Sequence, residues 1–197
     1  GTVLWDTELK KSGLDELYSW ESPPLSELLK IVNKNSQNLY AEQILKALGR
    51  RVEGRGSFEG GLAVVRRFLA KAGLKDEEHH LVDGSGLAEE NRLTARGLSK
   101  ILGSMSASPL FPVYFDSLAI PGVDRSARDR MKGEPLAGQM RVKRGTVKGA
   151  RNLAGYLRSK GGKAYSFIVL VNGPGLDRPA VDAATDELCA AAIRLLP

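Results

Sequence analysis

Apolar side chains recur at helical spacing through the first hundred residues of the chain. After Pro23 and Pro24, the stretch LSELLKIVNKN repeats its apolar residues at i, i+3, i+4 and i+7, which predicts a helix with one buried face. That face consists of Leu25, Leu28, Leu29 and Val32. A second helix is expected to follow, with Leu39, Ile44, Leu45 and Leu48 as its apolar positions, and to stop at Gly49.

Two further helices are predicted before the pattern changes. The stretch GGLAVVRRFLAKAG, residues 60–73, is apolar at helical spacing and bounded by glycines. The stretch LVDGSGLAEENRLTARGLSKIL, residues 81–102, begins as a turn and becomes helical after a cap at Thr94.

Strand-like patterns replace the helical ones after Gly122. Three strands are predicted within 138–147, 150–159 and 163–173, and SKGGK between the last two is typical of a hairpin. The run Phe167–Val171 is continuously apolar, so we expect it to be central. A helix from about Pro179 to Leu196 follows. The chain therefore predicts a single α/β or α+β domain, 1–197, with an antiparallel sheet flanked by helices.

Composition narrows the function classes. The chain has 197 residues, enough for one domain with a core, and no apolar run approaches the roughly 20 residues that span a bilayer. The net charge of +6 suits an acidic partner. The densest basic stretch, 141–151, contains no aromatic residue on which bases would stack, so we expect no nucleic-acid partner.

Several common site signatures are absent or weak, and we expect neither a metal nor a cofactor. Cys189 is the single cysteine and is interpreted as a small buried apolar residue. His79 and His80 are adjacent, so their side chains point apart on a regular element and do not favour a metal site. DGSG, 83–86, is interpreted as a tight turn, and GRGSFEGG lacks the spacing of a dinucleotide-binding loop.

One polar segment stands out at the corner between the first two helices. NKNSQN places Lys34, Ser36 and Asn38 on alternate positions and has the form K-x-S-x-N. These side chains either cap backbone groups or line an active site. Far downstream, RVKRGTVKGARNLAGYL has the form of a strand with Lys143, Gly145 and Thr146 in a K-x-G-T pattern, followed by its hairpin partner.

The ordered set of segments resembles a known family. SPPLSELLKIVNKNSQNLYAEQILKALG, DGSGLAEENRLT, SLAIPGVDRSARDR and GTVKGARNLAGYL are similar, in this order, to the serine D-Ala-D-Ala carboxypeptidases/endopeptidases called class C low-molecular-mass penicillin-binding proteins. The similarity spans about Ser22 to Asn172. It implies the penicillin-binding transpeptidase fold, which is β-lactamase-like, and hydrolysis of peptidoglycan peptides through a serine acyl-enzyme.

The family's motifs imply roles for residues of this chain. In the S-x-N motif, Ser36 would relay a proton to the leaving amine and Asn38 would hold the acyl side chain, with Lys34 beside them in the substrate-binding wall. In the K-T-G motif, Lys143 would supply positive charge opposite the substrate carboxylate. Arg144, Gly145 and Thr146 would bind substrate along the strand edge, where glycine lets a peptide backbone approach.

The sequence departs from the family pattern at two points. Arg144 replaces the threonine of K-T-G; an arginine binds a carboxylate bidentately, but its bulk also favours a blocked groove. No S-x-x-K occurs in the 197 residues, so the nucleophile is expected in a missing N-terminal part of the parent chain. Residues 1–197 would then be a C-terminal part of the domain, inactive alone. The alternative is a non-catalytic module that binds cell-wall peptide or a partner protein.

The resemblance also implies partners and a location. The expected ligands are a peptidoglycan peptide ending in D-Ala-D-Ala and β-lactam antibiotics, and the expected location is the periplasm or cell envelope. A sheet that lacks its N-terminal strands exposes an edge, so self-association is also expected.

Overall fold

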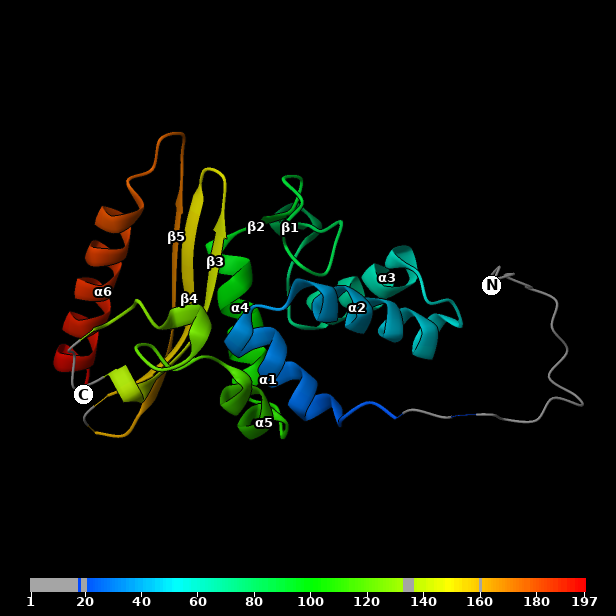
Figure 1. Ribbon diagram of the computed structural model, residues 1–197, viewed down its shortest axis with the longest axis horizontal. Helices are drawn as coiled ribbons and strands as arrows, with labels where there is room; N and C mark the ends of the chain where they lie inside the picture. The colour runs from blue at the N-terminus through cyan, green and yellow to red at the C-terminus, as the bar shows by residue number, and fades with distance from the viewer. Residues whose placement is uncertain (1–17, 19–20, 133–136, 160) are drawn as a thin grey trace, which may run out of the picture.

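The computed structural model describes Tyr18 and residues 21–132, 137–159 and 161–197. A three-stranded antiparallel sheet has helices on both faces, and a helical hairpin of α2 and α3 extends away from it (Figure 1). The helices are α1 (Leu25–Asn35), α2 (Asn38–Glu53), α3 (Phe58–Lys71), α4 (Ala95–Ser106), α5 (Phe111–Ser117) and α6 (Arg178–Leu195). The strands are β1 (His79–His80), β2 (Arg92–Leu93), β3 (Met140–Val147), β4 (Ala150–Arg158) and β5 (Ala164–Asn172). None of these helices is long and apolar enough to cross a membrane.

The sheet has the order β3-β4-β5, with each neighbouring pair antiparallel. The hairpin predicted between the last two strands is confirmed by the pairing of Arg158 with Ala164. The expectation that Phe167–Val171 is central is wrong within the described residues, because β5 lies at one end of the sheet. Its continuous apolar run reflects two covered faces: Phe167 packs toward the α6 side and Ile168 toward α4 and α5.

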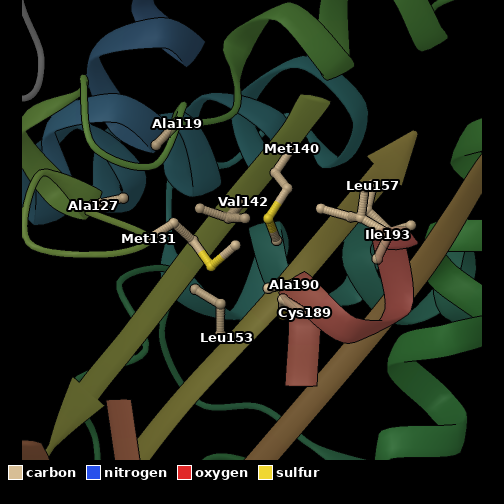
Figure 2. Close-up of a cluster of buried hydrophobic side chains, with 10 residues drawn as sticks. All are labelled: Ala119, Ala127, Met131, Met140, Val142, Leu153, Leu157, Cys189, Ala190 and Ile193. Carbon is tan, nitrogen blue, oxygen red and sulfur yellow. The ribbon is translucent and has the colours of Figure 1, made fainter. Parts of the chain in front are cut away.

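A buried core joins the sheet to α6. Alternate residues of β3 and β4 point to this face and meet small residues of α6 and of the loop 119–131 (Figure 2). Its fully buried members are Ala119, Ala127, Met131, Met140, Val142, Leu153, Leu157, Cys189, Ala190 and Ile193. The prediction that Cys189 is a buried residue is therefore confirmed, and burial raises the pKa of its thiol to about 11.

A smaller core covers the opposite face of the sheet. Tyr156 of β4 packs edge-on against Phe111 of α5, with ring centroids 5.1 Å apart, and its hydroxyl donates to Leu102 O of α4 at 2.7 Å. The cap predicted for α4 is confirmed, since Thr94 Oγ1 accepts from Gly97 N at 3.0 Å. The sheet thus fixes α4 and α5 on one face, and α5 in turn supports α1.

The second helix does not stop where the sequence predicts. Gly49 lies inside α2, which ends only before Gly54, a residue with φ +74°. A Cβ at Gly49 would lie 2.6 Å from Gly61 N of α3, so glycine is required there for close helix packing rather than for a helix end. The buried face predicted for α1 is also only partly correct, because Leu25 is 56% exposed and no residue of α1 is fully buried, although the helix packs on α5.

Candidate active site

The corner between α1 and α2 holds Ser36 in an unusual backbone conformation. Ser36 has φ 56° and ψ 51°, the left-handed region that residues other than glycine seldom adopt. Gln37 N donates to Val32 O at 3.3 Å and closes the last turn of α1, and α2 begins at Asn38. Strained residues of this kind are concentrated at functional sites.

Lys143 of β3 reaches this corner across the molecule. Its Nζ donates to Ser36 Oγ at 3.0 Å and to Arg144 O at 2.9 Å, although Ser36 and Lys143 are 107 positions apart in the chain. The structure therefore brings the serine of S-x-N together with the lysine of K-x-G-T.

Lys143 is a partly buried cation. Burial, and secondarily the positive charge of Arg144, lower the pKa of its ammonium. No carboxylate of the described residues forms an ion pair with it. The amine is thus held by neutral oxygens only and leaves a positive charge available for an anionic ligand.

β3 presents a partly open backbone edge beside Lys143. Val142 exchanges two hydrogen bonds with Ala119, of 2.8 and 3.0 Å, which covers that end of the edge. Because alternate residues of an edge strand direct their backbone groups outward, Arg144 and Thr146 present theirs next. Gly145 lies between them, and a Cβ there would meet only Asn152 Cβ at 3.8 Å. Packing inside the protein therefore does not demand glycine at this position.

The side chains of Arg144 and Thr146 engage charged residues on the α6 face of β3. Arg144 Nη1 contacts both oxygens of Asp129, at 2.6 and 2.8 Å. This hydrogen bond lowers the pKa of Asp129. Thr146 Oγ1 accepts from Arg151 Nη1 at 2.9 Å. The arginine is therefore tethered beside the strand edge instead of extending freely across it.

Lys34 and Asn38 occupy different environments at the corner. Lys34 Nζ forms an ion pair with Asp124 Oδ2 at 3.2 Å, and Asp124 also accepts from Ile120 N at 2.8 Å. These contacts tie the end of α1 to the loop that precedes β3. The half-buried Asn38 side chain makes no hydrogen bond to any described residue, so its amide is available to a ligand.

The loop that contains DGSG is fixed next to α2. Asp83 accepts from Gly86 N at 2.7 Å and from Ala88 N at 2.8 Å, and Gly86 has φ +77°. Glu42 of α2 accepts from the backbone amides of Gly84 and Ser85 at 2.9 and 3.0 Å. These polar groups of the DGSG loop are thus hydrogen-bonded within the loop and to α2, as expected for a tight turn.

No group of three or more His, Cys, Asp and Glu side chains within residues 21–132, 137–159 and 161–197 is arranged to hold a metal ion. His79 and His80 form the short strand β1 and pair with Leu93 and Arg92 of β2.

Three acidic or basic residues near the site were not anticipated. Asp129 binds Arg144, and Asp182 of α6 binds Arg151, which in turn contacts Thr146. Asp129 lies in VDRSARDR, where acids and bases alternate, but this segment contains neither Arg151 nor Asp182. Partners that lie 15 and 31 positions apart leave no local pattern.

Comparison with known proteins identifies the family. Residues 2–194 match the model of the D-Ala-D-Ala carboxypeptidase 3 (S13) family. Carboxypeptidase DacB from Mycolicibacterium smegmatis is 31% identical over 170 residues, which are 83% of this chain and 37% of that protein. D-alanyl-D-alanine carboxypeptidase from Actinomadura sp. is 32% identical over 157 residues, or 77% of this chain and 29% of the relative. The chain therefore spans about a third of the length of these relatives.

A solved structure agrees with the sequence comparison. Penicillin binding protein 4 from Haemophilus influenzae, complexed with a β-lactam, superposes with a TM-score of 0.73 and 26% identity over 84% of this chain and 42% of that protein. The predicted fold class, a penicillin-binding fold with an antiparallel sheet flanked by helices, is confirmed.

Proposed function

Because the chain belongs to the D-Ala-D-Ala carboxypeptidase 3 (S13) family, we propose that it forms two walls of a serine peptidase active site that cleaves peptidoglycan peptides ending in D-Ala-D-Ala. The single observation that carries this proposal is the 3.0 Å contact between Lys143 Nζ and Ser36 Oγ. It joins the two walls that S-x-N and K-x-G-T form in this family.

Ser36 acts as a proton relay in this proposal. Its Oγ accepts a hydrogen bond from Lys143, so its own hydrogen is free to be donated to the leaving amine of the terminal D-alanine. The depressed pKa of Lys143 helps proton transfer along this pair, because burial makes the ammonium a better donor. Asn38 holds the acyl side of the substrate through its unpaired amide.

The substrate lies along β3 as an added strand. The edge past Val142 supplies backbone groups, and Gly145 lets the peptide approach closely, which explains a glycine that internal packing does not require. Lys143 on one face of β3, and Arg144 and Thr146 on the other, bind the terminal carboxylate from the two sides of the strand edge. Lys34 supports this wall indirectly by fastening α1 to Asp124.

The nucleophile is assigned to polypeptide outside these residues. No S-x-x-K occurs in the sequence, and the chain spans only 37% of the M. smegmatis relative. A serine there attacks the penultimate carbonyl and forms an acyl-enzyme that water releases. Residues 1–197 are then a C-terminal part of the domain and inactive alone. The cell envelope is the proposed location, because peptidoglycan lies outside the cytoplasmic membrane.

Labelling with a fluorescent penicillin tests the proposal. The complete protein should be labelled covalently, and mass spectrometry of its peptides should place the adduct on a serine outside residues 1–197. Residues 1–197 alone should remain unlabelled. An adduct within 1–197 would overturn the assignment of the nucleophile, and a complete protein that takes no label would overturn the enzyme assignment.

A second candidate is a non-catalytic module that binds cell-wall peptide. Arg144 in place of threonine is the observation that favours it. The tether to Asp129 at 2.6 Å weakens the argument that the arginine blocks the groove. Reversible binding of a D-Ala-D-Ala peptide by the complete protein, without penicillin labelling or hydrolysis, would support the module over the enzyme.

A further inference from the structure

Arg151 of β4 stands directly opposite Thr146 of β3 in the sheet register. Its Nη1 donates to Thr146 Oγ1 at 2.9 Å, and the arginine side chain is only 8% exposed. A guanidinium has donors and no acceptor, so the hydroxyl oxygen must act as the acceptor in this contact. The hydrogen of the Thr146 hydroxyl is therefore left for another partner, and none of the residues that the structure describes accepts it.

Asp182 of α6 holds Arg151 in one orientation. Nε donates to Asp182 Oδ1 at 2.8 Å, and Nη2 contacts Oδ2, so the pair is bidentate. Asp182 also lies 3.3 Å from Nη1 of Arg130, a residue that is 1% exposed. Two of the three guanidinium nitrogens of Arg151 are thereby fixed, and the third can only face Thr146.

The charges of this cluster agree with a fixed, ionised pair. Burial opposes ionisation of Asp182, but the hydrogen bond from Arg151 and the charges of the surrounding arginines outweigh it and lower the pKa of the carboxyl. Asp182 and Arg151 are therefore both charged, and their bidentate contact directs the remaining guanidinium nitrogen, Nη1, toward Thr146.

We infer that Arg151 is a positioning residue for carboxylate recognition: by donating to the oxygen of Thr146, it fixes the Thr146 side chain and leaves the hydroxyl hydrogen to be donated to a ligand at the β3 edge. This inference rests on the proposed function, which places the terminal carboxylate of a D-Ala-D-Ala peptide at that edge. The Thr146 hydrogen makes a stronger hydrogen bond to an anionic carboxylate oxygen than to a neutral amide oxygen, so a peptide with a free terminal carboxylate is preferred.

Four variants of the complete protein separate positioning from a structural role. Arg151→Lys keeps the charge opposite Asp182 but lacks the fork that reaches Thr146 at the same time. Thr146→Val removes the hydroxyl, and the double variant combines both changes. Arg130→Lys is the matched control, since Arg130 contacts Asp182 and Asp186 of the same cluster without touching Thr146.

The readout is the ratio of the dissociation constants for acetyl-D-Ala-D-Ala and for the same peptide with its terminal carboxylate replaced by an amide. Ligand-observed NMR gives both constants, and thermal unfolding of each variant checks folding. Arg151→Lys and Thr146→Val should each reduce the preference for the carboxylate peptide by roughly tenfold, the size of one hydrogen bond to a charged group. The double variant should lose no more than either single one, because the two residues act as a unit.

The possible results are distinct. An unchanged preference in Arg151→Lys, additive losses in the double variant, or an equal loss in Arg130→Lys would overturn the inference. A native protein that does not distinguish the two peptides would overturn it as well, since Thr146 would then donate to no carboxylate. Absence of penicillin labelling in the native protein is a separate result, which overturns the proposed enzyme and leaves the binding ratio as the test of Arg151.

Discussion

Lys143 Nζ lies 3.0 Å from Ser36 Oγ, and through this contact the edge of the sheet meets the corner between α1 and α2. The contact requires a lysine on β3 that points away from the α6 core and a serine held in a left-handed conformation. Neither feature improves stability by itself, because one buries a charge and the other strains the backbone. Their combination is best explained by the chemistry proposed for the site.

Removal of the Ser36 hydroxyl should abolish most of the proposed activity. We expect Ser36→Ala and Ser36→Gly to lower the rate of penicillin acylation of the complete protein by on the order of a hundredfold, because both lose the proton relay. Glycine adopts φ 56° without strain, so Ser36→Gly should be more stable than Ser36→Ala by about 1 kcal/mol. Stopped-flow labelling and thermal unfolding measure the two effects. Ser22→Ala, at an exposed position, is the control; an active Ser36→Gly would refute the relay.

Lys143 should destabilise the protein at neutral pH. Its pKa is lowered in the folded state by burial and then by the charge of Arg144, so the unfolded chain binds its proton more tightly. Below the folded-state pKa the full penalty opposes folding, and it disappears as the pH rises toward the unfolded value of 10.5. Lys143→Met should therefore raise the free energy of unfolding at pH 7, and this gain should shrink toward pH 10.5.

Urea denaturation across this pH range measures the effect of Lys143. The exposed Lys148 on the same β-hairpin provides a matched control, since Lys148→Met should show no comparable gain. A Lys143→Met variant that is less stable than the native protein at pH 7 would show that the hydrogen bonds to Ser36 Oγ and Arg144 O outweigh the burial of the charge.

Most elements were predictable because their periodicity is local. The starts of α1 and α4 and the hairpin that joins β4 to β5 follow from Pro24, Thr94 and the glycines of SKGGK. The helix α5 was missed, since its seven residues are too few for a period and include Pro112. The position of β5 at one end of the sheet was also missed. A continuous apolar run indicates that both faces of the strand are covered, but it does not indicate which strands pair with it.

Only those site residues that belong to a sequence motif could be predicted from the sequence. Ser36 and Lys143 belong to short patterns whose order along the chain identified the family. Asp129, Arg151 and Asp182 have no such pattern, because an ion pair between distant elements depends on the folded arrangement alone. The left-handed backbone conformation of Ser36 could not be predicted either, because no sequence pattern indicates that a serine adopts it.

Close helix packing makes one glycine of α3 irreplaceable. A Cβ at Gly61 would lie 2.2 Å from Leu45 O of α2, whereas a Cβ at Gly103 of α4 would meet no atom within 4 Å. We expect Gly61→Ala to lower the free energy of unfolding by about 3 kcal/mol, because α2 and α3 must separate. Gly103→Ala should be neutral or stabilising by up to about 1 kcal/mol, since alanine favours a helix. Chemical denaturation of both variants tests this, and equal effects would contradict the packing argument.

The outer edge of β5 should make residues 1–197 self-associate when they are produced alone. No described strand pairs with that edge, and strand edges without a partner recruit other chains. Sedimentation velocity should show dimers or larger species that grow with concentration. Ser166→Lys places a charge at an exposed position of β5 and should reduce association, whereas Ser22→Lys, outside the sheet, should not. A strict monomer at high concentration would contradict the expectation that the sheet lacks N-terminal strands of the parent chain and exposes an edge.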